Sequence, residues 1–360
     1  SFSLKTPHTA FNYPGRHEMR TQNRRSCVEV LSLAKSHVRI VMKMSFQRVF
    51  KNHPFTSFSV VTLGLALILS CMSISVSSAQ DPAGHIRMVR ALKASKLGIQ
   101  NPAGLAFSMN EEVFHVVESR GTSQPPADSD VILVTPRPAQ LGRTRIPAWT
   151  DDPINMTFDN SYNRLLILKP NANILTSVKA GPDGRLNPGT LTHFDARRFG
   201  LQDPQGMAVD PASGDLVILD SAASSLIRVA RAPDGSFDGA KISRVDLQHL
   251  RSTGLRGLAI DPGSGHLHML DCTHQVLYEI TPGGQIHAIR DLSSFRLKDP
   301  RGMVFAPSGD QTDDASQMSL YLADSGRGAG RGSQPGSPGR IVELSLAAPV
   351  ASEASSFQST

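Results

Sequence analysis

Cysteine is scarce in this chain, with three residues among 360, at positions 27, 71 and 272. Beyond residue 79 only Cys272 remains, so no intramolecular disulfide can form within that part of the chain. Paired-cysteine zinc spacings are absent for the same reason. The fold must therefore be stabilised by a buried core, and residues 80–360 are numerous enough to form one.

Long apolar runs are also rare. The longest, SFSVVTLGLALILSCMSISV at 57–76, has a strongly apolar part over 60–69, which is shorter than the roughly 20 residues that cross a bilayer. Basic residues precede this run and small residues follow it, which is the order of an export signal. We therefore expect a signal peptide at 42–79, cleaved after about Ala79, and an upstream or disordered extension at 1–41.

Two alternatives to a cleaved signal remain for this segment. It could act as a membrane anchor, although its apolar part is short, or the chain could be a lipoprotein modified at Cys71, which follows Ile68-Leu69-Ser70. With a cleaved signal, the mature chain is exported to the periplasm or the cell exterior and has no membrane span. We expect it to be a monomer.

A surplus of positive charge is missing from the exported part. The whole chain has a formal charge of +6, but ten of its 37 Lys and Arg residues, and only two of its 31 Asp and Glu residues, lie in 1–79. Residues 80–360 are therefore close to neutral. Because a nucleic-acid-binding surface needs clustered basic side chains to neutralise phosphates, no nucleic-acid partner is expected.

What the chain does contain is a repeat. Residues 201–220, LQDPQGMAVDPASGDLVILD, read as a turn, a short apolar strand, a Pro/Gly turn and a second apolar strand that ends in Asp. The residue that opens the first strand recurs in steps of 51, 51, 51 and 45, at Gly104, Asn155, Gly206, Gly257 and Gly302. Steps of this size are typical of β-propellers.

Four strands per unit predict an all-β, five-bladed β-propeller over 84–346, followed by a disordered tail at 347–360. Blade five has only three strands of its own. We expect an N-terminal strand to complete it, because GHIRMVRALKASKLGIQNPAG (84–104) has the layout of GGQIHAIRDLSSFRLKDPRG (283–302). This strand would close the ring and remove its open edge. The alternative is a six-bladed ring, which needs a further strand pair.

The aligned units DPQGMAVDPASGDLVILDSAASSLIRV (203–229) and GLRGLAIDPGSGHLHMLDCTHQVLYEI (254–280) resemble the NHL repeats of a β-propeller family. The resemblance covers about 84–346 and implies a propeller fold. Propellers of this kind serve both as enzymes and as binding modules, so function has to be argued from the site.

Candidate ligand-binding residues lie in the turns that enter the innermost strands. Asp203 and Asp299 occupy matching positions there and are expected to surround one mouth of the central channel. The resemblance implies that Gln205, Arg256 and Arg301, at the next variable position, face the channel entrance. Two arginines from adjacent blades could bind a carboxylate or a sugar acid in fork geometry. The structural alternative is that the acids cap their own turns and the arginines neutralise them.

We expect no cofactor, with a single divalent cation such as calcium as the alternative. Similarity to propellers of the gluconolactonase and senescence-marker type implies a cation held in the channel by Glu, Asn and Asp. Asn155 stands where the other units have glycine, and Asp203 and Asp152 lie beside it in the repeat. The Glu-Gly-Pro motif that opens that family is absent.

Other polar residues at repeated positions are interpreted as structural. The acids that close the second strand are predicted to cap turns: Asp220, Asp271 and Asp324. His115 and His268 fall at a packed position and are predicted to be neutral, hydrogen-bonded core residues. The alternative for this region is a metal bound by His266 and His268 with Asp271 nearby.

Recognisable catalytic motifs are missing: there is no nucleophile elbow, HExxH or P-loop. We therefore expect an exported, non-catalytic β-propeller that binds a small polar ligand, a glycan or a protein partner. The alternative is a metal-dependent lactonase or hydrolase of the gluconolactonase type.

Overall fold

The computed structural model describes residues 85–118, 129–137, 139–146, 155–169, 173–239, 241–314, 316–326 and 339–346. All of them belong to one compact unit, Ala79–Thr360. The extension at 1–41, the signal peptide at 42–79 and the tail at 347–360 lie outside the described residues, and these expectations remain predictions. Within the described ranges, no helix has the length and hydropathy needed to cross a bilayer.

In the described part of the chain, twenty strands form five four-stranded antiparallel sheets, which confirms the five-bladed β-propeller. Blade one comprises β2 (Pro102–Ser108), β3 (Val113–Glu118), β4 (Ser129–Val134) and β5 (Gln140–Ile146). Blade two comprises β6 (Met156–Asp159), β7 (Arg164–Lys169), β8 (Ile174–Lys179) and β9 (Thr192–Asp195). Blade three comprises β10 (Pro204–Val209), β11 (Leu216–Asp220), β12 (Ser225–Val229) and β13 (Ile242–Asp246).

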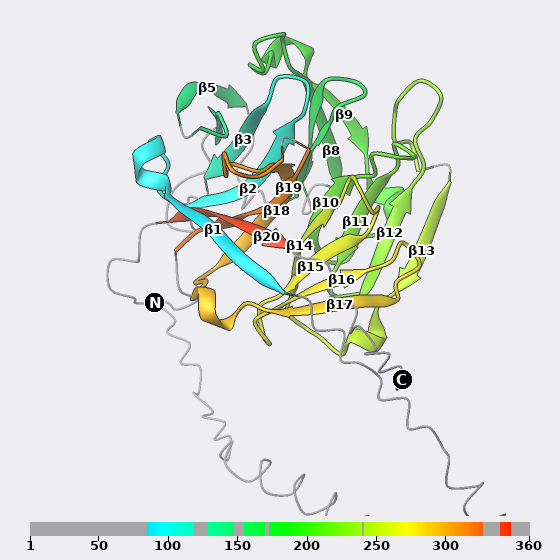
Figure 1. Cartoon of the computed structure of the whole chain (residues 1–360). Coiled ribbons are helices and arrows are strands. Elements are labelled where there is room, and N and C mark those ends of the chain that lie inside the picture. The colour runs from blue at the N-terminus through cyan, green and yellow to red at the C-terminus, as the bar shows by residue number, and fades with distance from the viewer. Residues whose placement is uncertain are drawn as a thin grey trace, which may run out of the picture. The chain divides into compact units, whose positions relative to one another are not determined.

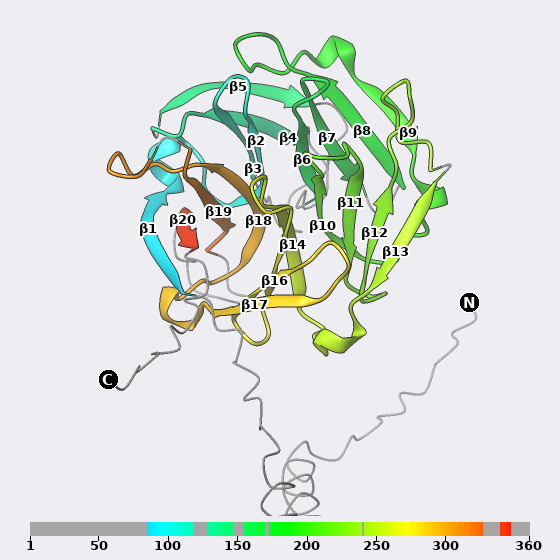
Figure 2. The same cartoon turned by 45° about the vertical axis from the view of Figure 1, so that its right-hand side comes forward.

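Blade four comprises β14 (Leu255–Ile260), β15 (Leu267–Asp271), β16 (Val276–Ile280) and β17 (Ile286–Asp291). Blade five comprises β18 (Pro300–Pro307), β19 (Met318–Asp324), β20 (Arg340–Leu346) and the N-terminal β1 (Ile86–Lys93). Short 3-10 helices include η1 (Ala94–Leu97), η3 (Pro188–Thr190), η4 (Arg197–Phe199), η5 (Gln248–Leu250) and η6 (Ser293–Phe295). Figure 2 shows the first strands of the blades near the middle of the unit and the fourth strands at its edge.

The residue pattern of each strand follows from its place in the blade. All five residues of β11, LVILD, are buried, because an inner strand is covered on both faces. In β13, ISRVD, exposed and half-buried residues occur together, because an outer strand has one face in solvent. This gradient from apolar to alternating strands explains why the blades are recognisable in the sequence.

An N-terminal strand closes the ring, as predicted. β1 pairs antiparallel with β20, from Ile86 opposite Leu346 to Lys93 opposite Arg340, and the two strands lie side by side in Figure 1. Arg90 links this strand to its surroundings: its Nε lies 2.5 Å from Glu343 Oε2 and its Nη2 donates to Pro136 O at 2.9 Å. The first and last parts of the ring are therefore joined by backbone and side-chain contacts.

Five apolar clusters fill the spaces between neighbouring blades. One cluster lies between each of the pairs one–two, two–three, three–four and four–five. The fifth joins blade five back to blade one, with Tyr321 and Ile341 packed against Phe114 and Val116. Phe114 and Tyr321 contact each other with ring centroids 4.8 Å apart. The core is thus divided into segments around the ring, and the last segment exists only because the ring is closed.

Glycine opens the innermost strands because neighbouring blades approach closely at that point. A Cβ on Gly206 would lie 2.6 Å from the backbone of Gly257, and a Cβ on Gly302 would lie 2.4 Å from Ala103 O. Real Cβ atoms do not reach such distances, so any larger residue would push the blades apart. The regular glycine spacing in the sequence therefore reflects the packing of inner strands around the axis.

Candidate functional site

Buried acids at the ends of the second strands position the turns that lead into the site. Asp220 is fully buried, and its carboxylate accepts backbone N–H groups of Gln202 and Asp203 at 2.7 and 2.9 Å. Asp324 does the same in blade five, accepting from Lys298 at 3.1 Å and from Asp299 at 2.8 Å. The predicted role of these acids as turn caps is confirmed, and it explains why an acid recurs at this position.

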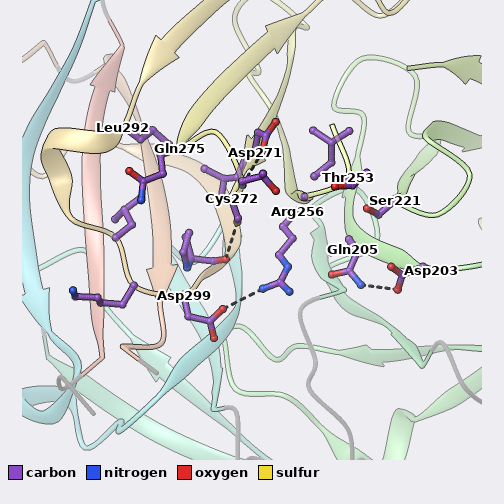
Figure 3. Close-up of a pocket in the computed structure, with 17 residues that line it drawn as sticks. Asp203, Gln205, Ser221, Thr253, Arg256, Asp271, Cys272, Gln275, Leu292 and Asp299 are labelled. Atoms are coloured by element: carbon purple, nitrogen blue, oxygen red, sulfur yellow. Dashed lines mark hydrogen bonds and ion pairs between the residues drawn. The ribbon is translucent and has the colours of Figure 1, made fainter. Parts of the chain in front are cut away.

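A cavity of about 430 Å³ lies where β10, β14 and β18 begin. We call it the entry cavity; it is lined by residues of blades three and four and by Lys298, Asp299 and Pro300 at the start of blade five. Figure 3 shows Arg256 within it, between Asp299 on one side and the pair Gln205–Asp203 on the other. Hydroxyl and amide groups also line it, from Ser221, Thr253, Thr273 and Gln275.

Asp299 is the centre of a charged cluster in this cavity. Arg256 Nη1 donates to its Oδ1 at 3.1 Å, and Arg301 Nε donates to its Oδ2 at 2.8 Å. Ser325 Oγ also donates to Oδ2, at 2.8 Å. The two predicted arginines therefore meet at one carboxylate. This arrangement matches the structural alternative given above, in which the arginines neutralise the acids of the turns. Asp299 neutralises part of their charge and holds both guanidinium groups in place.

Arg256 remains accessible although it is paired. Its side chain is 40% exposed, whereas that of Arg301 is 18% exposed. Among the described residues, Arg256 uses one of its five N–H donors, in the hydrogen bond from Nη1 to Asp299. The remaining donors are available for a ligand in the entry cavity. Arg301 contacts Asp299 but is not one of the residues that line the cavity.

Gln205 and Asp203 form the opposite wall. Gln205 Nε2 donates to Asp203 Oδ1 at 2.6 Å, and both side chains line the cavity. Asp203 does not cap its own turn, because that task falls to Asp220. Its second carboxylate oxygen is thus available, and the Gln205 amide oxygen faces the same space (Figure 3).

Asn155 is placed differently from the other predicted site residues. It is 1% exposed and does not line the entry cavity. Its Nδ2 donates to Pro204 O at 2.8 Å, while its buried Oδ1 has no donor among the described residues. Asn155 is therefore buried where blade two meets blade three, at a position that is glycine in the other blades, and its amide links the two blades. Its neighbour in the repeat, Asp152, lies outside the described residues.

Several cavity residues were not predicted from the sequence. Thr273 and Gln275 belong to the turn between β15 and β16, and Lys298 precedes the Asp299 turn. Cys272 also lines the cavity, but burial raises the pKa of its thiol to about 11, so it stays protonated and is a weak nucleophile at neutral pH. These residue types do not recur at the matching positions of blade three, so the repeat pattern does not single them out.

The histidines divide into core residues and a surface group. His115 is fully buried, and its Nε2–H donates to Gly184 O at 3.0 Å, while burial lowers its pKa from 6.5 to about 4. Burial lowers the pKa of His268 to about 4 as well. His115 is confirmed as a hydrogen-bonded core histidine. His268 is buried as predicted, but neither of its ring nitrogens has a hydrogen-bond partner among the described residues, so the hydrogen bond expected for it is missing. The alternative metal set of His266, His268 and Asp271 is not assembled, because Asp271 lies at the opposite end of β15 from His266 and His268 is only 2% exposed.

The sheet topology and blade order define the chain as a β-propeller. No family model and no curated protein sequence matches it. It is similar to a solved nidogen/laminin complex at 15% identity, covering 69% of this chain and 85% of that one, with a TM-score of 0.40. It is also similar to a luciferin-regenerating enzyme (12% identity, 71% and 95% coverage, TM-score 0.43) and to the PQQ-bound aldose sugar dehydrogenase of Streptomyces coelicolor (15%, 75% and 100%, 0.42).

These neighbours include binding proteins and enzymes, and their distance from this chain allows no activity to be transferred. The function has to be argued from the entry cavity itself.

Proposed function

We infer that the chain is an exported, NHL-type β-propeller whose entry cavity binds a small polyhydroxylated ligand with a carboxylate, such as a sugar acid, without catalysing a reaction. The NHL assignment rests on the repeated D-P-x-G turns and the acids that hold them. Export rests on the leader pattern at 42–79. The proposed ligand class rests on Arg256: Asp299 orients its guanidinium group, and its side chain is nevertheless exposed to the cavity.

The charges of the cavity favour a ligand of this kind. Three carboxylates line it, from Asp203, Asp271 and Asp299, and two cations, Arg256 and Lys298. Asp299 is already bound by two guanidinium groups, and the Asp271 carboxylate accepts from the backbone of Thr273 and His274. Arg256 donates to Asp299 through Nη1 alone among the described residues, and its other N–H donors suit a planar carboxylate.

The other walls fit the remainder of a sugar ring. Gln205, Ser221, Thr253 and Gln275 present hydroxyl and amide groups that can exchange hydrogen bonds with ring hydroxyls. Leu255, Leu270, Leu292 and Leu297 supply apolar surface for the faces of the ring. A volume of about 430 Å³ lies within the range of small-molecule pockets.

Isothermal titration with glucuronate and galacturonate tests this proposal, with glucose as the neutral comparison. Uronic acids should bind, and Arg256→Gln should weaken them about tenfold or more while changing glucose binding little, because a hydrogen bond to a charged group is worth about 1.5–3 kcal/mol. The matched control is Arg145→Gln, since Arg145 lies on β5 and is 69% exposed. If no uronic acid binds, or if the two variants behave alike, the proposal is wrong.

A metal-dependent lactonase is the second candidate, and one observation favours it. Asn155 Oδ1 is a buried acceptor without a donor among the described residues, and its amide contacts Pro204, the residue next to Asp203. Oxygens of Asn155 and Asp203 would suit a calcium ion, whereas Asp299 does not fit because guanidinium groups occupy both of its oxygens. Lactonase activity that disappears on chelation and in Asn155→Ala would establish this function instead.

A further inference from the structure

Three potential metal ligands meet on the outer part of blade four, away from the entry cavity. His266 lies just before β15, Glu279 lies on β16 and His287 lies on β17. One nitrogen or oxygen from each of the three residues lies within 4.8 Å of the others. Asp271, which lines the entry cavity, is at the opposite end of β15. We call these three residues the histidine cluster.

Glu279 is the centre of the cluster and is held by a separate contact. Its Oε1 lies 2.7 Å from His266 Nδ1 and 3.7 Å from His287 Nε2. Its Oε2 accepts from Arg290 Nη1, and the Arg290 side chain is 2% exposed. One carboxylate oxygen is therefore fixed by a buried arginine, while the other is directed at two imidazoles. A residue that orients a ligand through its second atom is a common feature of metal sites.

Two imidazoles and one carboxylate indicate which class of metal the histidine cluster can bind. We propose that the histidine cluster binds a divalent transition metal of the zinc class, with two imidazole nitrogens and one carboxylate oxygen as protein ligands. Imidazole favours zinc, nickel and copper over calcium and magnesium, which prefer oxygen ligands. Three protein ligands leave one tetrahedral position for water.

The present distances require only small movements. Zinc bonds of about 2.0–2.2 Å in tetrahedral geometry place ligand atoms about 3.3–3.6 Å apart. His266 Nδ1 would move about 0.6–0.9 Å away from Glu279 Oε1, and His287 Nε2 would move slightly closer to it. In the absence of metal, His266 Nδ1–H donates to that oxygen, and the metal would replace this proton.

The cluster is accessible, which separates it from the core histidines. The side chain of His287 is 42% exposed and that of His266 is 19% exposed, so solvent and a metal ion can reach both. The two rings contact each other, with centroids 4.4 Å apart and planes inclined by 51°. His268, on the same β15, is 2% exposed and is excluded from the ligand set by its burial.

The test is titration of the full chain with zinc chloride, and with cobalt chloride as a spectroscopic probe. The full chain should bind one more equivalent of zinc than the double variant His266→Ala/His287→Ala. It should also give a visible cobalt absorption that the double variant lacks. His287→Ala and Glu279→Gln should each weaken this site at least tenfold. His249→Ala, a change of an exposed histidine on η5, should leave it unchanged.

Thermal unfolding in chelator distinguishes a lost ligand from a lost fold, because His287→Ala should melt like the unaltered chain when no metal is present. Asn155→Ala should retain the zinc equivalent, which separates this site from the lactonase alternative. If the double variant binds as much zinc as the unaltered chain, or if His249→Ala removes the same equivalent, the proposal is overturned.

Discussion

Replacing Arg90 by methionine should lower the free energy of unfolding more than a comparable replacement of an exposed arginine. The Glu343 side chain is 1% exposed, and Arg90 is its charged partner, with Nε 2.5 Å from Oε2. Without Arg90, the Glu343 carboxylate keeps the Gly309 N–H at 2.7 Å and the Ser308 hydroxyl at 3.4 Å, and no cation among the described residues. Removing one partner of a buried ion pair costs about 3–5 kcal/mol, a large share of the stability of a typical domain.

Urea unfolding at pH 7 measures this loss as a lower midpoint at constant slope. The matched control is Arg87→Met on the same strand. Arg87 is 60% exposed and lies 4.0 Å from Asp310, so its loss should change the midpoint little. The double variant Arg90→Met/Glu343→Gln should recover part of the loss, because a neutral amide costs less to bury than a carboxylate. Equal midpoints for Arg90→Met and Arg87→Met would refute the placement of β1 in blade five.

Three further outcomes are expected. Gly206→Ala should lower the free energy of unfolding by about 1–3 kcal/mol, because the alanine Cβ would lie 2.6 Å from the Gly257 backbone. Gly263→Ala, whose Cβ would meet its nearest atom at 3.5 Å, should be tolerated in the same urea assay. Burial lowers the pKa of His115 from 6.5 to about 4. The free energy of unfolding should therefore be about 3 kcal/mol higher above pH 6.5 than near pH 4, because the imidazole is more easily protonated in the unfolded chain than in the core. His115→Leu should therefore flatten the fall of the urea midpoint between pH 6.5 and 4, and an unchanged fall would exclude His115 as its source. Because burial raises the pKa of Cys272 to about 11, its alkylation at pH 8 should be much slower than that of a free thiol, and a rate equal to the free thiol would contradict its burial.

The fold could be predicted because its causes are periodic. A propeller repeats the same turn, strand and cap in each blade, so Gly206, Gly302, Asp220 and Asp324 stand at fixed intervals that a single sequence displays. Closure by 86–93 could also be predicted, because that segment has the layout of an outer strand.

The site could be predicted only in part, because its contacts join different blades. Arg256 and Asp299 are 43 residues apart, and their ion pair depends on the angle between blades four and five. The sequence indicated the entrance position of Arg256 and offered neutralisation of the turn acids as the structural alternative, but it did not show that Arg256 and Arg301 share Asp299. Glu279 was missed as the partner of His266, because neighbouring strands and not sequence spacing bring them together. Asn155 reads as an exception in the repeat, and only the structure shows its contact with Pro204 O.

The most direct test of the closed ring is disulfide trapping between Arg87→Cys and Ser345→Cys. These positions are paired across β1 and β20, and paired residues of antiparallel strands have Cα atoms about 4.5–5.5 Å apart, which suits a disulfide. In a chain with Ser at positions 27 and 71, mild oxidation should cross-link this pair rapidly, while Arg87→Cys with Ser243→Cys on β13 should not cross-link within the monomer. Failure of the first pair to form, or equal formation of both, would show that the N-terminal strand does not complete blade five.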